Sequence, residues 1–447
     1  MKGALKRSPG NSKAFPVAIP KAPSFQVLRR QLESDQIHRV RIGFCESCLT
    51  IDDYAKLCKS IRHNTSLTHV EVGWELPRFV LLRLLDSITQ LPSLESLSLI
   101  IYASLPKRLL RRLVSIPTLK HLELRNVTIG ASPWKERLIL NTTGNLSMAS
   151  GTRQQASVLA NYFSDSIESL HLVACDFGEK DIESFCAWTE RRQRPLQDLG
   201  FAFSASIASE CLARLCRRAN CRLLDLTGCG LGDNDAFVLA QNLPKSKTIE
   251  NLVVARNPLW GIGTDSSTPP SCPGFEEFLQ VAFRVLKGLD LSCCELSEAQ
   301  VDNILQKLTK KDTGSSIESL TMFGIPKYCD KDNALLPQIL RNNSVLKSLR
   351  IRPTADPYHN LLFSEEQVAS IEESLVENYT IETLQLGHSS VLLDLLLGLN
   401  QAGRRYLRDQ QPNVPVDWAK ILARASLRPD VLFWLLRNGM DHITTGN

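Results

Sequence analysis

A short alternation of hydrophobic and polar positions recurs along this chain. In each copy an apolar residue is followed by two variable positions, a second apolar residue, one variable position and a third apolar residue. Such alternation predicts a short β-strand that buries one face. The twelve copies begin at Ile37, Leu67, Leu94, Leu119, Ile167, Leu196, Cys221, Ile249, Leu286, Ile317, Leu346 and Ile381.

The segments between copies favour helices. Successive copies begin 25 to 37 residues apart, apart from one gap of 48 residues. Apolar residues at helical spacing occur between them, as in YAKLCKSIRHN (54–64) and FSEEQVASIEESLVEN (363–378). Asn64, Asn343 and Asn378 each stand three residues before the next copy, where we expect the left-handed conformation that ends a helix. Each unit therefore predicts a strand, a turn, a helix and a return to the sheet.

The repeated pattern resembles the leucine-rich repeats of the ribonuclease-inhibitor-like class, whose long units carry a full helix. The resemblance covers residues 37–390, or about 12–13 units. It implies an α/β solenoid, shaped as a horseshoe, with a parallel sheet on the concave face and helices on the convex face. This scaffold carries many functions, so the resemblance implies a fold and not an activity.

Two long intervals and the two ends need separate treatment. Residues 130–166 have room for a degenerate repeat, which we favour over an inserted loop; 258–274 are rich in Gly, Pro and Ser and predict a surface loop. Solenoid ends expose apolar surface that must be covered. We therefore expect a helical cap at 25–36 and a second at 391–447, where Trp418 and Trp434 lie on apolar faces.

Composition favours a soluble, cytoplasmic protein. No apolar run is long enough to cross a bilayer, and the thirteen cysteines without a secretory signal favour free thiols in a reducing compartment. The net charge of +5 equals the charge of the basic, acid-free leader 1–24, so it does not predict nucleic-acid binding. We expect this leader to be disordered; an organelle transit peptide is the alternative, and a nuclear location stays open.

The cysteines do not predict chemistry. Counting from the first apolar residue of a copy, the ninth residue is Cys45, Cys175, Cys229, Asn257 or Cys294 in five copies. In the resembled repeats this position points inward at the turn after the strand. Cys45 and Cys48 lack the second pair of ligands that a zinc site needs, so we expect no metal. Cys293 is a candidate for an exposed reactive thiol.

A partner would meet the concave face, where the third, fifth and seventh residues of each copy point. Arginines lie near both ends of this face, aspartates lie in the middle, and Trp74 lies at the early rim; Trp and Arg are frequent binding hot spots. The candidate partner-binding residues are Arg39, Arg41, His69, Glu71, Trp74, His121, Glu123, Arg125, Asp198, Asp225, Asp290, Arg350 and Arg352.

These residues favour a non-enzymatic scaffold that binds a protein or peptide. The chain has no GxxxxGK[ST], strand-linked GxGxxG or GxSxG motif, and its histidines are spread over different repeats, so we expect no catalytic residue and no cofactor. We expect a monomer that binds neither nucleic acid nor membrane. The alternative is regulation of a small GTPase, since Ran-type GTPase activators use similar long repeats, although no residue here matches their catalytic residues. A hydrolase is the least favoured class.

Overall fold

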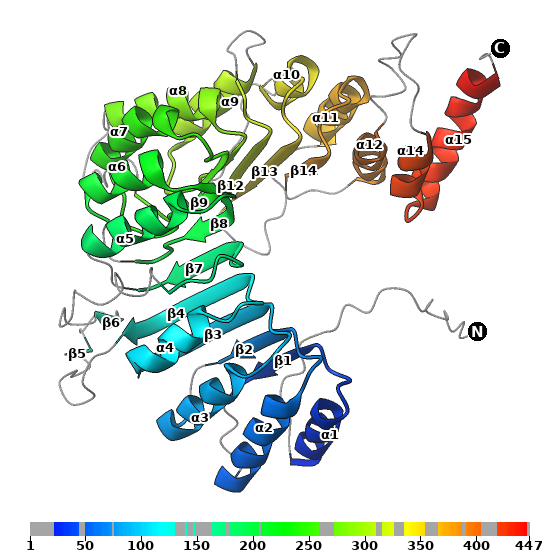
Figure 1. Ribbon diagram of the computed structural model, residues 1–447. Helices are drawn as coiled ribbons and strands as arrows, with labels where there is room; N and C mark the ends of the chain where they lie inside the picture. The colour runs from blue at the N-terminus through cyan, green and yellow to red at the C-terminus, as the bar shows by residue number, and fades with distance from the viewer. Residues whose placement is uncertain are drawn as a thin grey trace. The chain divides into compact units, whose positions relative to one another are not determined.

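The structure is a computed structural model in which twelve strands form a parallel sheet, in chain order β1-β2-β3-β4-β7-β8-β9-β10-β11-β12-β13-β14 (Figure 1). It describes residues 22–43, 50–73, 76–129, 139–140, 146–147, 162–175, 179–204, 207–258, 272–309, 315–325, 335–353, 365–386, 390–403 and 418–444. The chain divides into two compact units, Met1–Arg222 and Leu223–Asn447, and each is described by itself.

The first unit alternates strands with helices. Its strands pair in parallel from β1 to β4, β4 pairs with β7, and β7 pairs with β8. The elements are α1 (Ala22–Glu33), β1 (Arg39–Ile42), α2 (Ile51–His63), β2 (His69–Val72), α3 (Arg78–Ile88), β3 (Ser96–Leu105), α4 (Lys107–Val114), β4 (His121–Ile129), β7 (Ser169–Val173), α5 (Glu179–Glu190), β8 (Leu196–Gly200) and α6 (Ser209–Arg218).

The second unit continues the alternation from β9, which spans the division between the units, and ends in a group of helices. Strands β9 to β14 pair in parallel in chain order. The elements are β9 (Cys221–Asp225), α7 (Asp233–Asn242), the 3-10 helix η2 (Leu243–Lys245), β10 (Asn251–Val253), α8 (Pro273–Val285), β11 (Gly288–Asp290), α9 (Glu298–Thr309), β12 (Ser319–Ile325), α10 (Leu335–Asn342), β13 (Ser348–Pro353), α11 (Glu365–Glu377), β14 (Thr383–Gln385), α12 (Val391–Ala402), α14 (Trp418–Ala425) and α15 (Pro429–Thr444).

Each of the twelve copies coincides with one of these strands, which confirms the leucine-rich-repeat α/β fold. The apolar positions of the pattern are buried, as in Leu286, Leu289 and Leu291, which are at most 3% exposed. Within each unit the helices lie on one face of the strands (Figure 1). We call the other face of the strands the open face. Strand β1 shows the alternation, with Arg39 and Arg41 exposed and Val40 and Ile42 buried.

The prediction of a degenerate repeat within 130–166 is wrong. Strand β4 pairs directly with β7, so no strand intervenes between them in the sheet. The described part of the interval instead forms β5 (Ile139–Leu140) and β6 (Leu146–Ser147), an antiparallel pair of its own. The segment lacks the alternating apolar positions that bury a strand against the helices. The predicted loop at 258–274 lies mainly outside the described residues, at 259–271.

The asparagines before the strands act through their side chains, and the expected left-handed backbone is wrong. Asn64 has φ −76° and ψ 132°, an extended conformation. Its side-chain Nδ2 donates to the Leu32 carbonyl at 2.6 Å, and its Oδ1 accepts from the Leu67 amide at 2.7 Å. Asn378 does the same with the Leu340 carbonyl and the Ile381 amide. Buried amide side chains thus join the end of a helix in one repeat to the start of the next repeat.

Left-handed backbone occurs elsewhere, at the eighth position of the copies. In five copies this residue lies in the turn directly after the strand, whereas Asn126 lies within β4 and Gly324 within β12. Its positive φ turns the backbone so that the ninth side chain points inward. The backbone continues the ladder across this turn, as the Ala174 amide donates to the Ala202 carbonyl at 2.8 Å and the Arg256 amide to the Ser292 carbonyl at 2.7 Å. The eighth residues with positive φ are Asn126, Ala174, Phe203, Gly228, Arg256, Cys293 and Gly324.

Helices lie next to the first and last repeats of the described chain. Helix α1 contacts α2 and buries Leu28 and Leu32. Helix α12 contacts α11, α14 and α15, and Asn400 in α12 donates to the Ile381 carbonyl at 2.7 Å. Trp434 in α15 is half-buried, whereas the side chain of Trp418 lies outside the described residues. Among the helices that the structure describes, none is both long and apolar enough to cross a membrane.

Candidate functional site

The open face of the first unit begins with two rows of charged side chains. The parallel register places Arg39 opposite His69 and Arg41 opposite Glu71. The Arg41 Nε lies 3.0 Å from the Glu71 Oε1, so these two predicted residues neutralise each other. Both side chains keep contact with solvent, and an exposed ion pair of this kind adds little stability.

His69 lies between several charged groups. Its Nδ1 is 2.8 Å from the Thr68 Oγ1. Burial lowers the pKa of His69, and the positive charge of Arg39 and His121 lowers it further, whereas Glu95 raises it. His69 is therefore neutral at pH 7, since even an ordinary histidine is mostly uncharged there.

Glu123 organises the centre of the first unit's open face. Its Oε2 accepts from the Ser98 Oγ at 2.8 Å on the neighbouring strand. Its Oε1 accepts from the Arg125 Nη2 at 2.9 Å on its own strand. The carboxylate is thus held on both sides, and most of its charge is balanced by Arg125.

The last strands of this unit, β7 and β8, bring polar groups into contact. The Asp198 Oδ2 accepts from the Ser169 Oγ at 2.7 Å. His171 covers Gly200, since a Cβ added at Gly200 would lie 2.6 Å from the His171 Nδ1. His171 was absent from the predicted residues, although its fifth position in the copy marks it as an open-face residue.

The open face of the second unit carries two aspartates on either side of Val253. Register pairs Val253 with Asp225 on β9 and with Asp290 on β11. The Asp225 Oδ1 accepts from the Thr227 amide at 2.9 Å and from the Thr227 Oγ1 at 2.6 Å. The Asp290 Oδ1 accepts from the Ser292 amide at 2.8 Å.

Asp290 is the more strongly perturbed carboxyl. Burial raises the pKa of Asp290, and the neighbouring Asp225 raises it further. Hydrogen bonds from Ser292 and the charge of Arg350 act in the opposite direction. The ionised carboxylate is therefore less well stabilised here than in water.

Two arginines occupy the far side of this open face. Arg350 and Arg352 are exposed on β13, and Thr321 on β12 separates Arg350 from Asp290 in the register. Within the described part of the chain, neither guanidinium forms a hydrogen bond or an ion pair within 4 Å. Trp74, the remaining predicted residue, lies outside the described residues.

The ninth-position side chains are buried and point inward, as predicted. The Cys294 Sγ donates to the Val254 carbonyl at 3.2 Å, and the Cys175 Sγ lies 3.6 Å from the Leu124 carbonyl of the preceding strand. The Asn257 Nδ2 reaches the Leu226 carbonyl at 2.8 Å. Burial raises the pKa of Cys294 to about 12, so this thiol is not a nucleophile at neutral pH. Cys45 lies outside the described residues.

Cys293 is exposed, as the sequence suggested, and its backbone has φ 55°. Among the described residues, no group of three or more His, Cys, Asp or Glu side chains could hold a metal ion.

One feature that sequence reasoning missed is a row of alternating charges at the second position of the copies. The Lys120 Nζ lies 3.0 Å from the Glu95 Oε1 in the first unit. In the second unit, Lys287 pairs with Glu250 at 3.1 Å and Lys347 with Glu318 at 2.5 Å. Aligning the second positions of the copies would have revealed this alternation. In each of these three pairs the acid directly before one strand meets the base directly before the next, which supports the register of the sheet.

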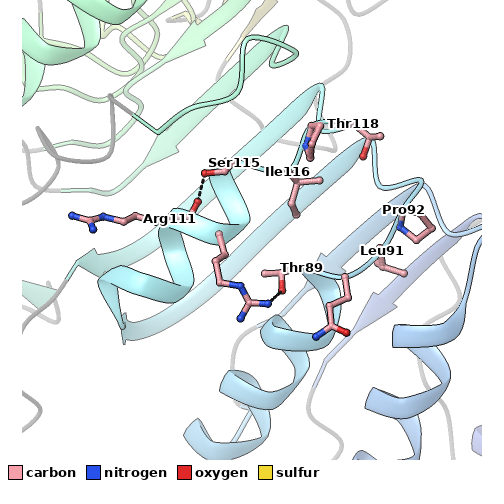
Figure 2. A pocket seen from close by; sticks show the side chains of 10 residues that line it. Thr89, Leu91, Pro92, Arg111, Ser115, Ile116 and Thr118 are labelled. Atoms are coloured by element: carbon pink, nitrogen blue, oxygen red, sulfur yellow. Dashed lines mark hydrogen bonds between the residues drawn. The ribbon is translucent and has the colours of Figure 1, made fainter.

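A hollow of about 530 Å³ lies between the segments that follow α3 and α4 (Figure 2). The Arg112 guanidinium already has partners within the protein, since its Nη2 donates to the Thr89 Oγ1 at 2.7 Å and its Nη1 donates to the Asp86 carboxylate. Figure 2 shows the Arg111 side chain directed away from the other labelled residues, and its guanidinium lies over the Tyr162 ring. No carboxylate and no predicted site residue lines this hollow, so it offers no acid–base pair. Its lining residues are Thr89, Gln90, Leu91, Pro92, Arg111, Arg112, Ser115, Ile116, Pro117 and Thr118.

No protein-family model and no curated protein sequence matches the chain. The solved structures that are similar to it include the following two. One is a Bacteroides fragilis protein from a structural genomics programme, with 12% identity and a TM-score of 0.34, covering 58% of this chain and 76% of that chain. The other comes from the crystal structure of the Rad7 and Elc1 complex in yeast, with 14% identity and a TM-score of 0.31, covering 66% of this chain and 79% of that chain.

Proposed function

We propose that this chain is a non-enzymatic scaffold that binds a protein or peptide on the open face of its sheet. One observation carries the proposal: helices cover one face of the strands, whereas the other face presents polar and charged side chains at the third and fifth positions of the copies. Each strand contributes only a few such side chains, but neighbouring strands place them in rows. A row of this kind offers an extended surface of the type that repeat proteins use for binding.

We also propose that the repeats belong to the ribonuclease-inhibitor-like class. Two observations support it. Strands alternate with full helices in most repeats, and in four copies the ninth position carries a buried Cys or Asn, namely Cys175, Cys229, Asn257 and Cys294. We propose the same partner-binding residues as in the sequence analysis. In the first unit these are Arg39, Arg41, His69, Glu71, His121, Glu123, Arg125 and Asp198. In the second unit they are Asp225, Asp290, Arg350 and Arg352.

Capture of partners from native lysate tests the proposal. The variants are Arg39→Glu with Arg41→Glu in the first unit and Arg350→Glu with Arg352→Glu in the second. A matched control, Lys56→Glu with Lys59→Glu, reverses two exposed charges on α2. We expect mass spectrometry to show partners that are lost from at least one open-face variant and retained by the control.

The opposite pattern would contradict the proposal. If the control lost the partners while both open-face variants kept them, the binding surface would be the helical face. If all three variants kept every partner, neither charged rim of the open face would belong to the site. Circular dichroism and thermal unfolding of each variant separate a loss of binding from a loss of folding.

A further inference from the structure

The charges on the open faces of the two units are arranged differently. In the first unit Arg41 pairs with Glu71, and Arg125 pairs with Glu123. At the fifth position of the copies in the second unit, the aspartates and Arg350 do not pair with each other. Asp290 and Arg350 flank Thr321 in the register, so two strand spacings, about 10 Å, separate their backbones.

The second unit's charges are also incompletely compensated. Asp290 accepts a hydrogen bond from Ser292, yet burial and Asp225 still disfavour its ionised form. Arg350 and Arg352 have no ion-pair partner within 4 Å among the residues that the structure describes. Uncompensated charge at a partly buried site becomes more favourable when a ligand supplies the opposite charge.

We propose that the open face of the second unit binds an extended peptide segment that carries a basic side chain and an acidic side chain. The basic side chain lies over Val253, between Asp225 and Asp290, and the acidic side chain reaches Arg350 and Arg352. This proposal rests on the proposed function and adds the chemistry of the partner.

The spacing of the two ligand charges follows from the sheet. Val253 on β10 and Arg350 on β13 are three strands apart, about 14 Å at the usual strand separation. An extended chain advances about 3.3 Å per residue, so a segment that crosses the strands places the two charges about four residues apart. Between the two sites the side chains of Ser319 and Thr321 are short, which leaves room for the backbone of the segment, whereas the Asn251 side chain lies over Gly288.

A random dodecapeptide library displayed on phage tests the proposal on the full chain. The library is panned against wild type, against Asp225→Asn with Asp290→Asn, and against Arg350→Gln with Arg352→Gln. A control, Glu277→Gln with Arg284→Gln, neutralises two exposed charges on α8. We expect wild type and control to enrich peptides with Lys or Arg about four residues from Asp or Glu. Peptides selected on the aspartate variant should no longer be enriched in Lys or Arg but should still be enriched in Asp or Glu. Peptides selected on the arginine variant should show the reverse.

Affinities of one selected, fluorescently labelled peptide give the quantitative test. Each charge-removing variant should weaken its binding about tenfold. Replacing the basic residue of the peptide by Gln should weaken binding to wild type but not to the aspartate variant. The proposal would be overturned if the protein and peptide substitutions weakened binding independently of each other, or if no peptide were enriched. It would also be overturned if spermidine, a cation without an acidic group, displaced the labelled peptide equally well.

A steric variant separates this proposal from the proposed function. Thr321→Trp places a large side chain in the middle of the second unit's open face. If it abolishes peptide binding while the charge variants have no effect, the open face binds but the charge pattern proposed here is wrong. If it leaves the affinity unchanged, peptides bind elsewhere and the open face of this unit fails as a binding site.

Discussion

Asp290 is the open-face residue whose chemistry departs most clearly from that of an exposed side chain. Burial and Asp225 raise its pKa, so the folded protein binds this proton more tightly than the unfolded chain does. Asp53 is the opposite case, because the backbone amide and the hydroxyl of Thr50 stabilise its carboxylate and lower its pKa. The two carboxyls should therefore affect stability with opposite dependence on pH.

For Asp290, we expect the stability difference between Asp290→Asn and wild type to change with pH. The ionised side chain is disfavoured in the folded state, so wild type loses stability as the pH rises from the ordinary carboxyl pKa through the raised pKa of Asp290. Over this pH range the free energy of unfolding of the variant should rise relative to that of wild type, and the difference should persist at pH 7. Urea unfolding between pH 3.5 and 7 measures the difference. A variant that is weakened most at pH 7 would contradict the raised pKa.

Asp53→Asn serves as the comparison for this pH series. The stabilising contribution of the Asp53 carboxylate is present above the ordinary carboxyl pKa and is lost as the pH falls through the lowered pKa. This variant should therefore be less stable than wild type at pH 7 and approach wild type in acid. If Asp53→Asn instead gained stability relative to wild type as the pH rose, the lowered pKa of Asp53 would be contradicted.

The ninth-position residues share a place but not an equal number of hydrogen bonds. Asn257 donates to the Leu226 carbonyl and accepts from the Leu231 amide at 3.1 Å, whereas the Cys294 Sγ donates a weak hydrogen bond to the Val254 carbonyl. We expect Asn257→Ala to cost about 2–4 kcal/mol, since it leaves buried backbone groups without partners. Cys294→Ala should cost only about 1 kcal/mol. If chemical denaturation showed equal losses of unfolding free energy for the two variants, both residues would stabilise the protein only by filling space.

At the scale of elements, the sequence pattern located every strand of the parallel sheet, because nearly every copy buries three regularly spaced apolar residues; on β14 the middle one, Leu384, is half-buried. It also located helices such as α2 and α11 from their apolar spacing. It did not predict the β5–β6 pair, whose two-residue strands carry no alternation. Nor did it predict the length of β3, ten residues, since its register shifts between Ile100 and Ala103.

The candidate site was predicted less completely than the fold. Alternation identified which residues face away from the helices, and the register confirms neighbours such as Arg41 and Glu71. It could not show that these charges neutralise each other while those of Asp290 and Arg350 stay apart, because that depends on side-chain geometry. The extended backbone of Asn64 was likewise hidden, since Asn satisfies a helix end either by its backbone or by its amide.

The contact between α7 and α8 provides a test of helix packing. A Cβ at Gly274 would lie 2.1 Å from the Asp233 carbonyl oxygen, which belongs to the backbone and cannot turn aside. We expect Gly274→Ala to destabilise the protein by more than about 2 kcal/mol. Gly232→Ala is the matched control, because nothing lies within 4 Å of its Cβ position. Similar unfolding midpoints for both variants would rule out this close contact.

At the scale of the whole molecule, the last helices complete the core of the final repeats. Leu399 is fully buried in α12, and Asn400 satisfies the Asn378 and Ile381 carbonyls. A chain ended at residue 386 would leave these carbonyls and the apolar surface of α11 uncovered. We expect it to unfold at a lower temperature and to aggregate, as measured by thermal unfolding and light scattering. Unchanged unfolding and solubility would show that the last helices are not a cap.

The central claim is that partners meet the open face of the sheet. Site-specific photo-crosslinking in native lysate tests it most directly, with a benzophenone amino acid placed at Ser96 or Thr321 on the open face and at Lys59 or Gln280 on the helices. The account predicts that at least one open-face position crosslinks to a discrete partner and that the helix positions do not crosslink to it. Crosslinks to that partner from the helix positions alone would contradict the account.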